Sequence, residues 1–142
     1  MFRHMFHAMH YHRTYFKDVN VLPPGKVLEM ATIDAAKGLG MEKEIGSIEI
    51  GKKADIILVD MRKPHLYPYN MIPSRMAYFA HGSDVDTVIV DGEILMQNRA
   101  VKTVNEEDVL DNAQFEAEAI LSRTGTRSLL ALSENYWGHS HY

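Results

Sequence analysis

Three segments, taken in order along the chain, constrain its fold more than the rest of the sequence does. Residues 30–40 have the spacing of a helix, residues 45–59 pass from a glycine-punctuated stretch into an apolar one, and residues 85–96 carry Asp91-Gly92 between two apolar runs. An Asp-Gly pair in this position is typical of the two-residue turn of a β-hairpin. A helix followed by a strand and a hairpin predicts an α/β fold.

The helical spacing begins before residue 30, and the pattern as a whole predicts one helix from Lys26 to Leu39. Gly38 and Gly40 supply its end, since glycine readily adopts the left-handed conformation of a C-terminal cap. The predicted apolar face of this helix consists of Leu28, Ala31, Ala35 and Leu39. The alanines indicate close packing against a larger body.

Local signals predict three further helices. Residues 1–16 have apolar side chains near helical spacing, residues 73–80 have a proline in the first turn, and a third helix follows an Asn105 cap and ends at Gly125. The apolar stripe of the third helix is made of Val109, Ala113, Ala117 and Ile120 or Leu121.

The segment from Ala54 to Val59 is apolar without alternation, which predicts a strand that is buried on both faces. Together with the hairpin, it provides too few strands to close a barrel. The strands of this chain would therefore present unpaired edges.

Length and composition exclude several classes of protein. At 142 residues the chain is too short for a complete (β/α)8 barrel, which takes about 250 residues. The formal charge of -4, with acidic and basic residues interspersed, gives no basic surface for nucleic acid. No apolar run reaches the roughly 20 residues of a membrane span. The absence of cysteine fits a reducing compartment and predicts a cytoplasmic protein.

The same segments, from at least Val27 to Gly125, resemble the C-terminal part of a metal-dependent amidohydrolase. The similar branch of that family contains deaminases and chlorohydrolases, among them S-adenosylhomocysteine deaminase, guanine deaminase and the triazine hydrolases. In these enzymes a metal-bearing barrel lies beside a small β-sandwich, to which both chain ends contribute strands. The resemblance implies an α/β fold that is part of a larger enzyme and not a complete TIM barrel.

The resemblance also implies a division of the chain into three parts. Residues 1–42 are similar to terminal helices of the barrel, residues 43–104 to strands of the composite β-sandwich, and residues 105–142 to the C-terminal helix and tail. The implied partner is the missing N-terminal and barrel portion of the same enzyme. The intact enzyme is expected to form a homo-oligomer.

By this resemblance, the chemistry of the parent enzyme is hydrolysis of a non-peptide C–N or C–Cl bond on a heteroaromatic ring, as in an aminohydrolase. The family holds a divalent metal, for which zinc is expected, with a His-x-His pair, two later histidines and an aspartate. No position of this chain matches those ligands. The resemblance therefore implies no catalytic, cofactor-binding or metal-ligating residue here, and a scaffold that is inactive alone.

The sequence contains eight histidines, so a metal site still needs to be weighed. His4, His7 and His10 are spaced three residues apart on the first predicted helix, and His12 forms a His-x-His pair with His10. A helical pair needs at least a third ligand from elsewhere. We therefore favour residues on a barrel exterior or at an interface, and a histidine-based metal-binding module is the alternative. The same two interpretations apply to the tail pair, His139 and His141.

Asp55 and Asp60 flank the apolar strand and could form a catalytic pair of carboxylates, but ordinary turn chemistry explains both. Ser74, Arg75 and His81 are the remaining candidates, since an arginine can clamp an anion and a histidine can move a proton. Without a nucleophile or metal within reach, a packing or subunit-contact role is favoured for them.

The methionines are interpreted as residues of a core or an interface, and they are Met5, Met9, Met71, Met76 and Met96. A further alternative for the whole chain is a non-catalytic domain that self-associates through its exposed strand edges.

Overall fold

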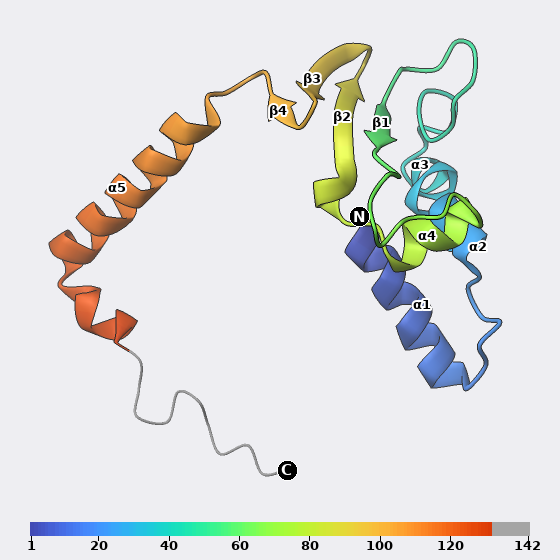
Figure 1. Cartoon of the computed structure of the whole chain (residues 1–142), viewed down its shortest axis with the longest axis horizontal. Helices are drawn as coiled ribbons and strands as arrows, with labels where there is room; N and C mark the ends of the chain where they lie inside the picture. The colour runs from blue at the N-terminus through green and yellow to red at the C-terminus, as the bar shows by residue number, and fades with distance from the viewer. Residues whose placement is uncertain (132–142) are drawn as a thin grey trace. The chain divides into compact units, whose positions relative to one another are not determined.

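The computed structural model describes residues 1–131 and divides the chain into two compact units, Met1–Thr103 and Val104–Tyr142 (Figure 1). The first unit combines helices with an antiparallel sheet, so the mixed α and β content matches the prediction. Among the described residues, no helix combines the length and apolar character needed to cross a membrane.

Four helices belong to the first unit: α1 (Phe2–Phe16), α2 (Pro24–Ala31), α3 (Ile33–Gly38) and α4 (Ile72–Tyr78). The predicted first helix is confirmed, and it ends at Lys17, whose φ of 53° is left-handed. The predicted proline lies in the first turn of α4. Helices α1, α2 and α4 contact one another, and they lie together in Figure 1.

The prediction of one continuous helix from Lys26 to Leu39 is wrong. The chain leaves helical geometry at Thr32, where φ is -126° and ψ is -99°, and this break separates α2 from α3. The Thr32 hydroxyl donates a hydrogen bond to the Leu28 carbonyl at 2.6 Å. A β-branched residue whose hydroxyl bonds the preceding turn is a poor helix former, which accounts for the position of the break.

The break also changes which side chains are buried. Val27 and Ala36 are buried, whereas Leu39, which was assigned to the apolar face, is 71% exposed. The predicted face is therefore wrong at Leu39 and at Ala35, which is also exposed, because the bend at Thr32 interrupts the periodicity from which it was read.

Two glycines fix the chain after α3. The Gly40 N–H bonds the Lys37 carbonyl at 3.0 Å and the Met41 N–H bonds the Ala36 carbonyl at 2.8 Å, which is the pattern of a Schellman cap with Gly40 at φ 71°. Gly46 then passes directly over α3. A Cβ at Gly46 would lie 2.7 Å from the Cβ of Ala36, and its φ is 92°, so this close approach requires glycine.

The sheet consists of β1 (Ile56–Val59), β2 (Val85–Val90), β3 (Glu93–Gln97) and β4 (Ala100–Val101), in that order and antiparallel throughout. The predicted hairpin is confirmed as β2–β3. Its turn residues Asp91 and Gly92 have φ values of 50° and 84°, as a type I′ turn requires.

The prediction that Ala54–Val59 is buried on both faces is wrong for this chain. Ile57 is 49% exposed and Leu58 is 52% exposed. Successive residues of a strand point to opposite faces of the sheet, so the exposure of both side chains means that neither face of β1 is fully covered by residues 1–131. The apolar run alone cannot indicate whether its cover lies within the same chain.

The core of the first unit lies where α1, α2, α4 and the start of β2 meet. Its largest fully buried side chains are Met9, Leu66 and Val27. The interpretation of Met5 and Met9 as core residues is confirmed, and Met76 and Met96 pack against the same cluster. Met71, in contrast, is 72% exposed.

The second unit contains α5 (Glu106–Thr124) followed by the 3-10 helix η2 (Thr126–Leu130). Both predicted ends of α5 are confirmed. The Asn105 side chain accepts a hydrogen bond from the Glu107 N–H at 3.2 Å, and Gly125 closes the helix at φ 67°. None of the residues of α5 is buried, so its predicted apolar stripe is exposed.

Candidate functional site

The polar cluster most like a functional site joins His65, His81 and Asp84. Asp84 ends the short 3-10 helix η1 (Gly82–Asp84) just before β2, and only 3% of it is exposed. Its Oδ2 atom lies 2.9 Å from Nε2 of His65 and accepts a hydrogen bond from the His81 N–H at 2.7 Å. One buried carboxylate oxygen therefore holds two segments together.

The chain positions these groups by local means. The Asp84 N–H donates to the His81 carbonyl at 3.0 Å, and the Asp84 side chain reaches back to the His81 N–H, as in a helix-capping arrangement. His65 arrives from the loop that follows β1, where the adjacent Leu66 is completely buried and anchors the loop. The His65 side chain itself is 38% exposed.

The electrostatics of the cluster favour an ionised Asp84. Burial on its own would raise the pKa of Asp84, but the hydrogen bonds from His65 and from the His81 N–H outweigh it, so that the pKa lies below its usual value. A carboxylate at this distance orients the His65 imidazole. The His65 and His81 rings are close, with centroids 5.4 Å apart.

This arrangement can hold the His65 imidazole in place. Within residues 1–131, no three side chains of histidine, aspartate or glutamate are grouped so that they could hold a metal ion. The described residues therefore do not fit the divalent metal that the resemblance implies. The cluster connects the loop after β1 to the start of β2.

Sequence reasoning identified His81 but missed His65 and Asp84. His65 lies between a proline and a buried leucine in a loop, and Asp84 immediately precedes an apolar strand. A polar residue at such a strand start is a weak signal of a buried hydrogen-bonding role. The pairing itself joins residues 19 positions apart and cannot be read from spacing.

The structure does not join Ser74 and Arg75 to His81 in one site. The Arg75 Nη2 donates to Asn70 Oδ1 at 3.4 Å, and its guanidinium carbon lies 5.6 Å from the centroid of the Phe79 ring. Arg75 thus contacts its own helix and the preceding loop. The packing or subunit-contact role that the sequence favoured for these residues stays a prediction.

The four histidines of α1 are all exposed. Three of them contact aromatic neighbours on the same helix: the ring centroids of Phe6 and His10 are 4.2 Å apart, those of His7 and Tyr11 6.4 Å, and those of His12 and Phe16 6.3 Å. His12 Nδ1 lies 2.9 Å from the Ala8 carbonyl oxygen. His139 and His141 lie outside the described residues.

Asp55 and Asp60 both bond backbone N–H groups. The expectation for Asp55 was a local partner, but its Oδ1 accepts from the Asp91 N–H at 2.7 Å and so ties the start of β1 to the hairpin turn. Asp60 Oδ1 accepts from the Arg62 N–H at 2.9 Å. That bond and the nearby Lys63 ammonium lower the pKa of Asp60.

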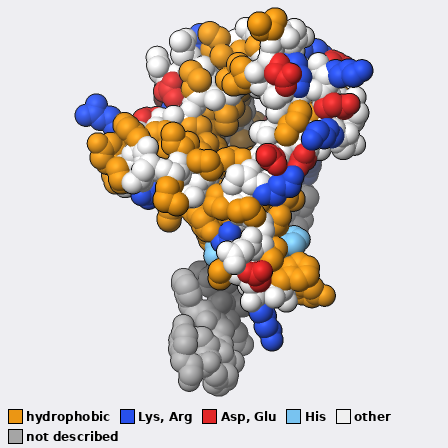
Figure 2. All heavy atoms as spheres, turned by 90° about the vertical axis from the view of Figure 1, so that its right-hand side faces the viewer, with side chains coloured by type: hydrophobic (Ala, Val, Ile, Leu, Met, Phe, Trp, Pro, Cys, Tyr) orange, Lys and Arg blue, Asp and Glu red, His pale blue; other side chains and the backbone are white. Residues whose placement is uncertain are grey.

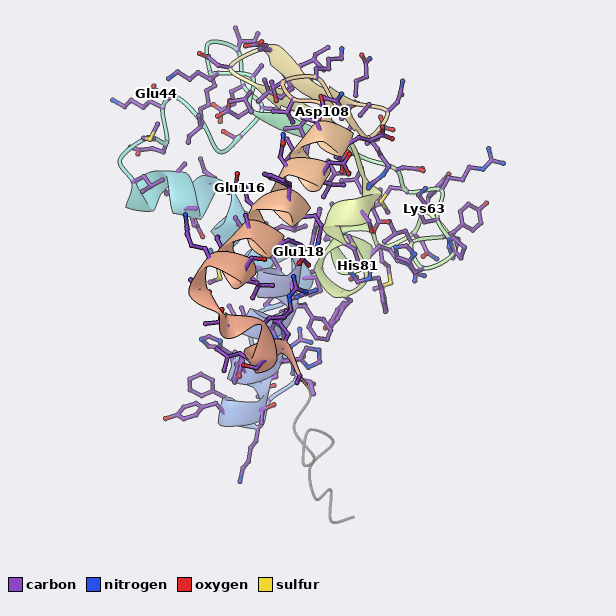
Figure 3. The ribbon with its side chains drawn as sticks, turned by 90° about the vertical axis from the view of Figure 1, so that its left-hand side faces the viewer. Glu44, Lys63, His81, Asp108, Glu116 and Glu118 are labelled. Carbon is purple, nitrogen blue, oxygen red and sulfur yellow. The ribbon has the colours of Figure 1, made fainter. Side chains whose placement is uncertain are left out.

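A hollow of about 270 Å³ lies between α1 and α4, and its lining is mainly apolar but includes Arg3, His7 and His81. Figure 3 shows His81 beside α4. Large exposed apolar side chains are also frequent elsewhere in the first unit, and hydrophobic atoms spread across the middle of the face in Figure 2. The most exposed of them include Leu39, Ile48 and Ile50, and Ile57 and Leu58 are about half exposed.

Comparison with known proteins decides the family. The model of the amidohydrolase family matches residues 1–95. The chain belongs to the amidohydrolase family. The predicted resemblance to its deaminase and chlorohydrolase members is confirmed by the relatives that follow.

The chain is 47% identical over 123 residues to a 5-methylthioadenosine/S-adenosylhomocysteine deaminase of Thermoanaerobacter pseudethanolicus. The aligned region covers 84% of this chain and 28% of the relative. It is 46% identical over 112 residues to a 5'-deoxyadenosine deaminase of Methanosarcina acetivorans, covering 79% of this chain and 26% of that protein. The chain thus spans only about a quarter of the length of these relatives.

Two solved structures support the same fold. A zinc-bound adenosine deaminase from Xanthomonas campestris superposes with a TM-score of 0.80 at 27% identity, covering 86% of this chain and 28% of that one. A zinc complex of an atrazine chlorohydrolase from Arthrobacter aurescens TC1 gives a TM-score of 0.59 at 22% identity, covering 66% of this chain and 20% of that one, which supports the fold alone.

Proposed function

We propose that this chain is the C-terminal scaffold portion of an aminohydrolase that deaminates the adenine ring of a 5'-substituted adenosine. The observation that carries the proposal is the 47% identity over 123 residues to a 5-methylthioadenosine/S-adenosylhomocysteine deaminase, of which the chain covers 28%. The reaction replaces the ring amino group with oxygen from water and releases ammonia.

The proposed partner of the chain is the remaining portion of the same enzyme. Support comes from apolar side chains that have no cover here, such as Ile57 and Leu58 on the edge strand β1 and Ile48 and Ile50 in the loop before it. Exposed apolar surface on this scale is typical of an interface. A cytoplasmic location belongs to the same proposal, since the chain contains no cysteine.

The divalent metal of the intact enzyme would be held by residues outside this chain. Zinc is present in the solved adenosine deaminase and atrazine chlorohydrolase structures, whereas the described residues group no set of three ligands. The role of this chain is then to support the barrel. Its Asp84–His65 pair fixes the loop after β1, so that α4 and β2 keep their positions around Leu66.

Co-expression tests the proposal. The T. pseudethanolicus deaminase, cut just before the region that matches this chain, would be produced with and without this chain and assayed for release of ammonia from 5'-methylthioadenosine. We expect a stable complex and metal-dependent deamination only when both pieces are present. A soluble barrel portion that neither binds this chain nor gains activity from it would contradict the proposal.

A further inference from the structure

The outer face of α1 is aromatic and hollowed. Two shallow hollows share Tyr11: one of about 250 Å³ is completed by His7, His10 and Thr14, and one of about 330 Å³ by His12, Tyr15 and Phe16. Tyr11 is 74% exposed and Tyr15 is 80% exposed. Aromatic side chains concentrated on an exposed helix face are typical of an interface.

The same face is free of negative charge. Helix α1 contains two arginines and four histidines, and it has no acidic residue. Arg13 points toward the interior of its unit, where its Nε donates to the Val21 carbonyl at 2.9 Å and its guanidinium bonds the Tyr78 hydroxyl. Arg3 is exposed and carries a positive charge, and the four exposed imidazoles can hydrogen-bond carboxylates, so this face presents no negative charge to an acidic partner.

Helix α5 has the complementary chemistry. Its 19 residues include six acids and one arginine, and Figure 3 shows Asp108, Glu116 and Glu118 spaced along it. The apolar stripe of α5 has alanines at its centre and larger exposed residues beside them, including Val109 at 51%, Leu110 at 62% and Ile120 at 46%.

A helix of this length with no buried residue is marginally stable by itself. Covering its stripe would remove Val109 and Ile120 from water. The central Ala113 and Ala117 leave space for large side chains of a partner, and the exposed Tyr11 and Tyr15 rings of α1 are of that kind. Small side chains on one helix therefore face large ones on the other, and the acidic helix meets a helix without acidic residues.

We propose that two copies of this chain associate reciprocally, with α5 of each copy docked on the outer face of α1 of the other. The second copy is the favoured occupant because a symmetric dimer forms the α5–α1 contact twice and leaves neither site open. A single helix docked once would bury little area for a stable complex. Two α5 helices are poorly suited to pair with each other, since both are strongly acidic. The inference does not depend on the proposed deaminase function.

Solution mass at two salt concentrations tests the proposal on the full chain. Sedimentation equilibrium should give a dimer at about 50 mM NaCl. At about 500 mM NaCl the dissociation constant of the dimer should be at least tenfold higher, because salt screens the surface charges. Ala117→Glu places a charge in the stripe and should abolish the dimer. Ala119→Glu is the matched control, since Ala119 is exposed on another side of α5, and it should leave the dimer intact.

Mixing two variants identifies the pairing. Tyr11→Glu should be monomeric, as should Ala117→Glu, but an equimolar mixture of the two should form dimers, because one copy retains a working α5 and the other a working α1. Circular dichroism confirms that each variant is folded. A monomeric parent chain at both salt concentrations, a Tyr11→Glu variant that still dimerises, or a mixture that stays monomeric would each overturn the proposal.

Discussion

Asp84 shows how one buried carboxylate can determine the position of a loop. It accepts hydrogen bonds from His65 Nε2 at 2.9 Å and from the His81 N–H at 2.7 Å while only 3% exposed. Asp84→Ala leaves the His81 N–H unsatisfied and should lower the free energy of unfolding of the first unit by about 1–3 kcal/mol in urea titrations at neutral pH. Asp111→Ala on exposed α5 is the control and should change it little.

The pH dependence of stability provides a second prediction for Asp84. Its pKa in the folded chain is lowered, so its ionised form contributes stability above its unfolded pKa, near 3.9, and this contribution is lost as the pH falls through the folded value. Asp84→Asn should therefore flatten the loss of stability on the acid side. An unfolding free energy with the same acid dependence in the variant and the parent would contradict this assignment.

Among the glycines of residues 1–131, Gly46 is the one at which an added Cβ would meet other atoms within 4 Å. Gly46→Ala would place a Cβ 2.7 Å from the Ala36 Cβ at a φ of 92°, so thermal unfolding should show a loss of about 1–3 kcal/mol. Gly38 provides the matched control, because nothing lies within 4 Å of a Cβ built there. Gly38→Ala should be neutral or slightly stabilising, and equal losses for both variants would refute the packing explanation.

At the scale of elements, α5 depends on its ends more than on its faces. The Asn105 side chain bonds the Glu107 N–H at 3.2 Å, and no residue of the helix is buried. Asn105→Ala should reduce the helical signal in circular dichroism and destabilise α5 by about 1 kcal/mol. Asn112→Ala, in the exposed interior of the same helix, should instead increase helicity. A larger effect at Asn112 would contradict the capping role.

The elements also show which features a sequence reveals. The Asp91-Gly92 turn, the Asn105 cap and the proline in the first turn of α4 were predictable because each acts within a few residues. The break at Thr32 was missed because the surrounding residues continue a helical pattern. The Asp84–His65 bond was missed because it joins two separate segments.

The scale of the whole molecule explains the exposed strand. The apolar run of β1 was correctly predicted to form a strand. The prediction that this strand is buried on both faces is wrong for this chain, since Ile57 and Leu58 are about half exposed. The pattern of a sequence records the environment of the complete protein. A chain that spans about a quarter of its relatives can carry that pattern without the surface that covers it.

The family of the chain is known from its sequence, and its role as a scaffold is our proposal. Membership in the amidohydrolase family follows from the match over residues 1–95, whereas the role as a scaffold is a proposal about chemistry. It requires that the groups which activate water are located outside the chain. No set of three suitable ligands occurs among residues 1–131.

The most direct measurement is a deaminase assay on the purified 142-residue protein with zinc added. Conversion of 5'-methylthioadenosine would be followed by chromatography over a long incubation at high protein concentration. We predict product formation no faster than in buffer with zinc alone. Turnover that exceeds this background, scales with protein concentration and is removed by a chelator would show that the chain holds its own catalytic centre, and would contradict the proposed role.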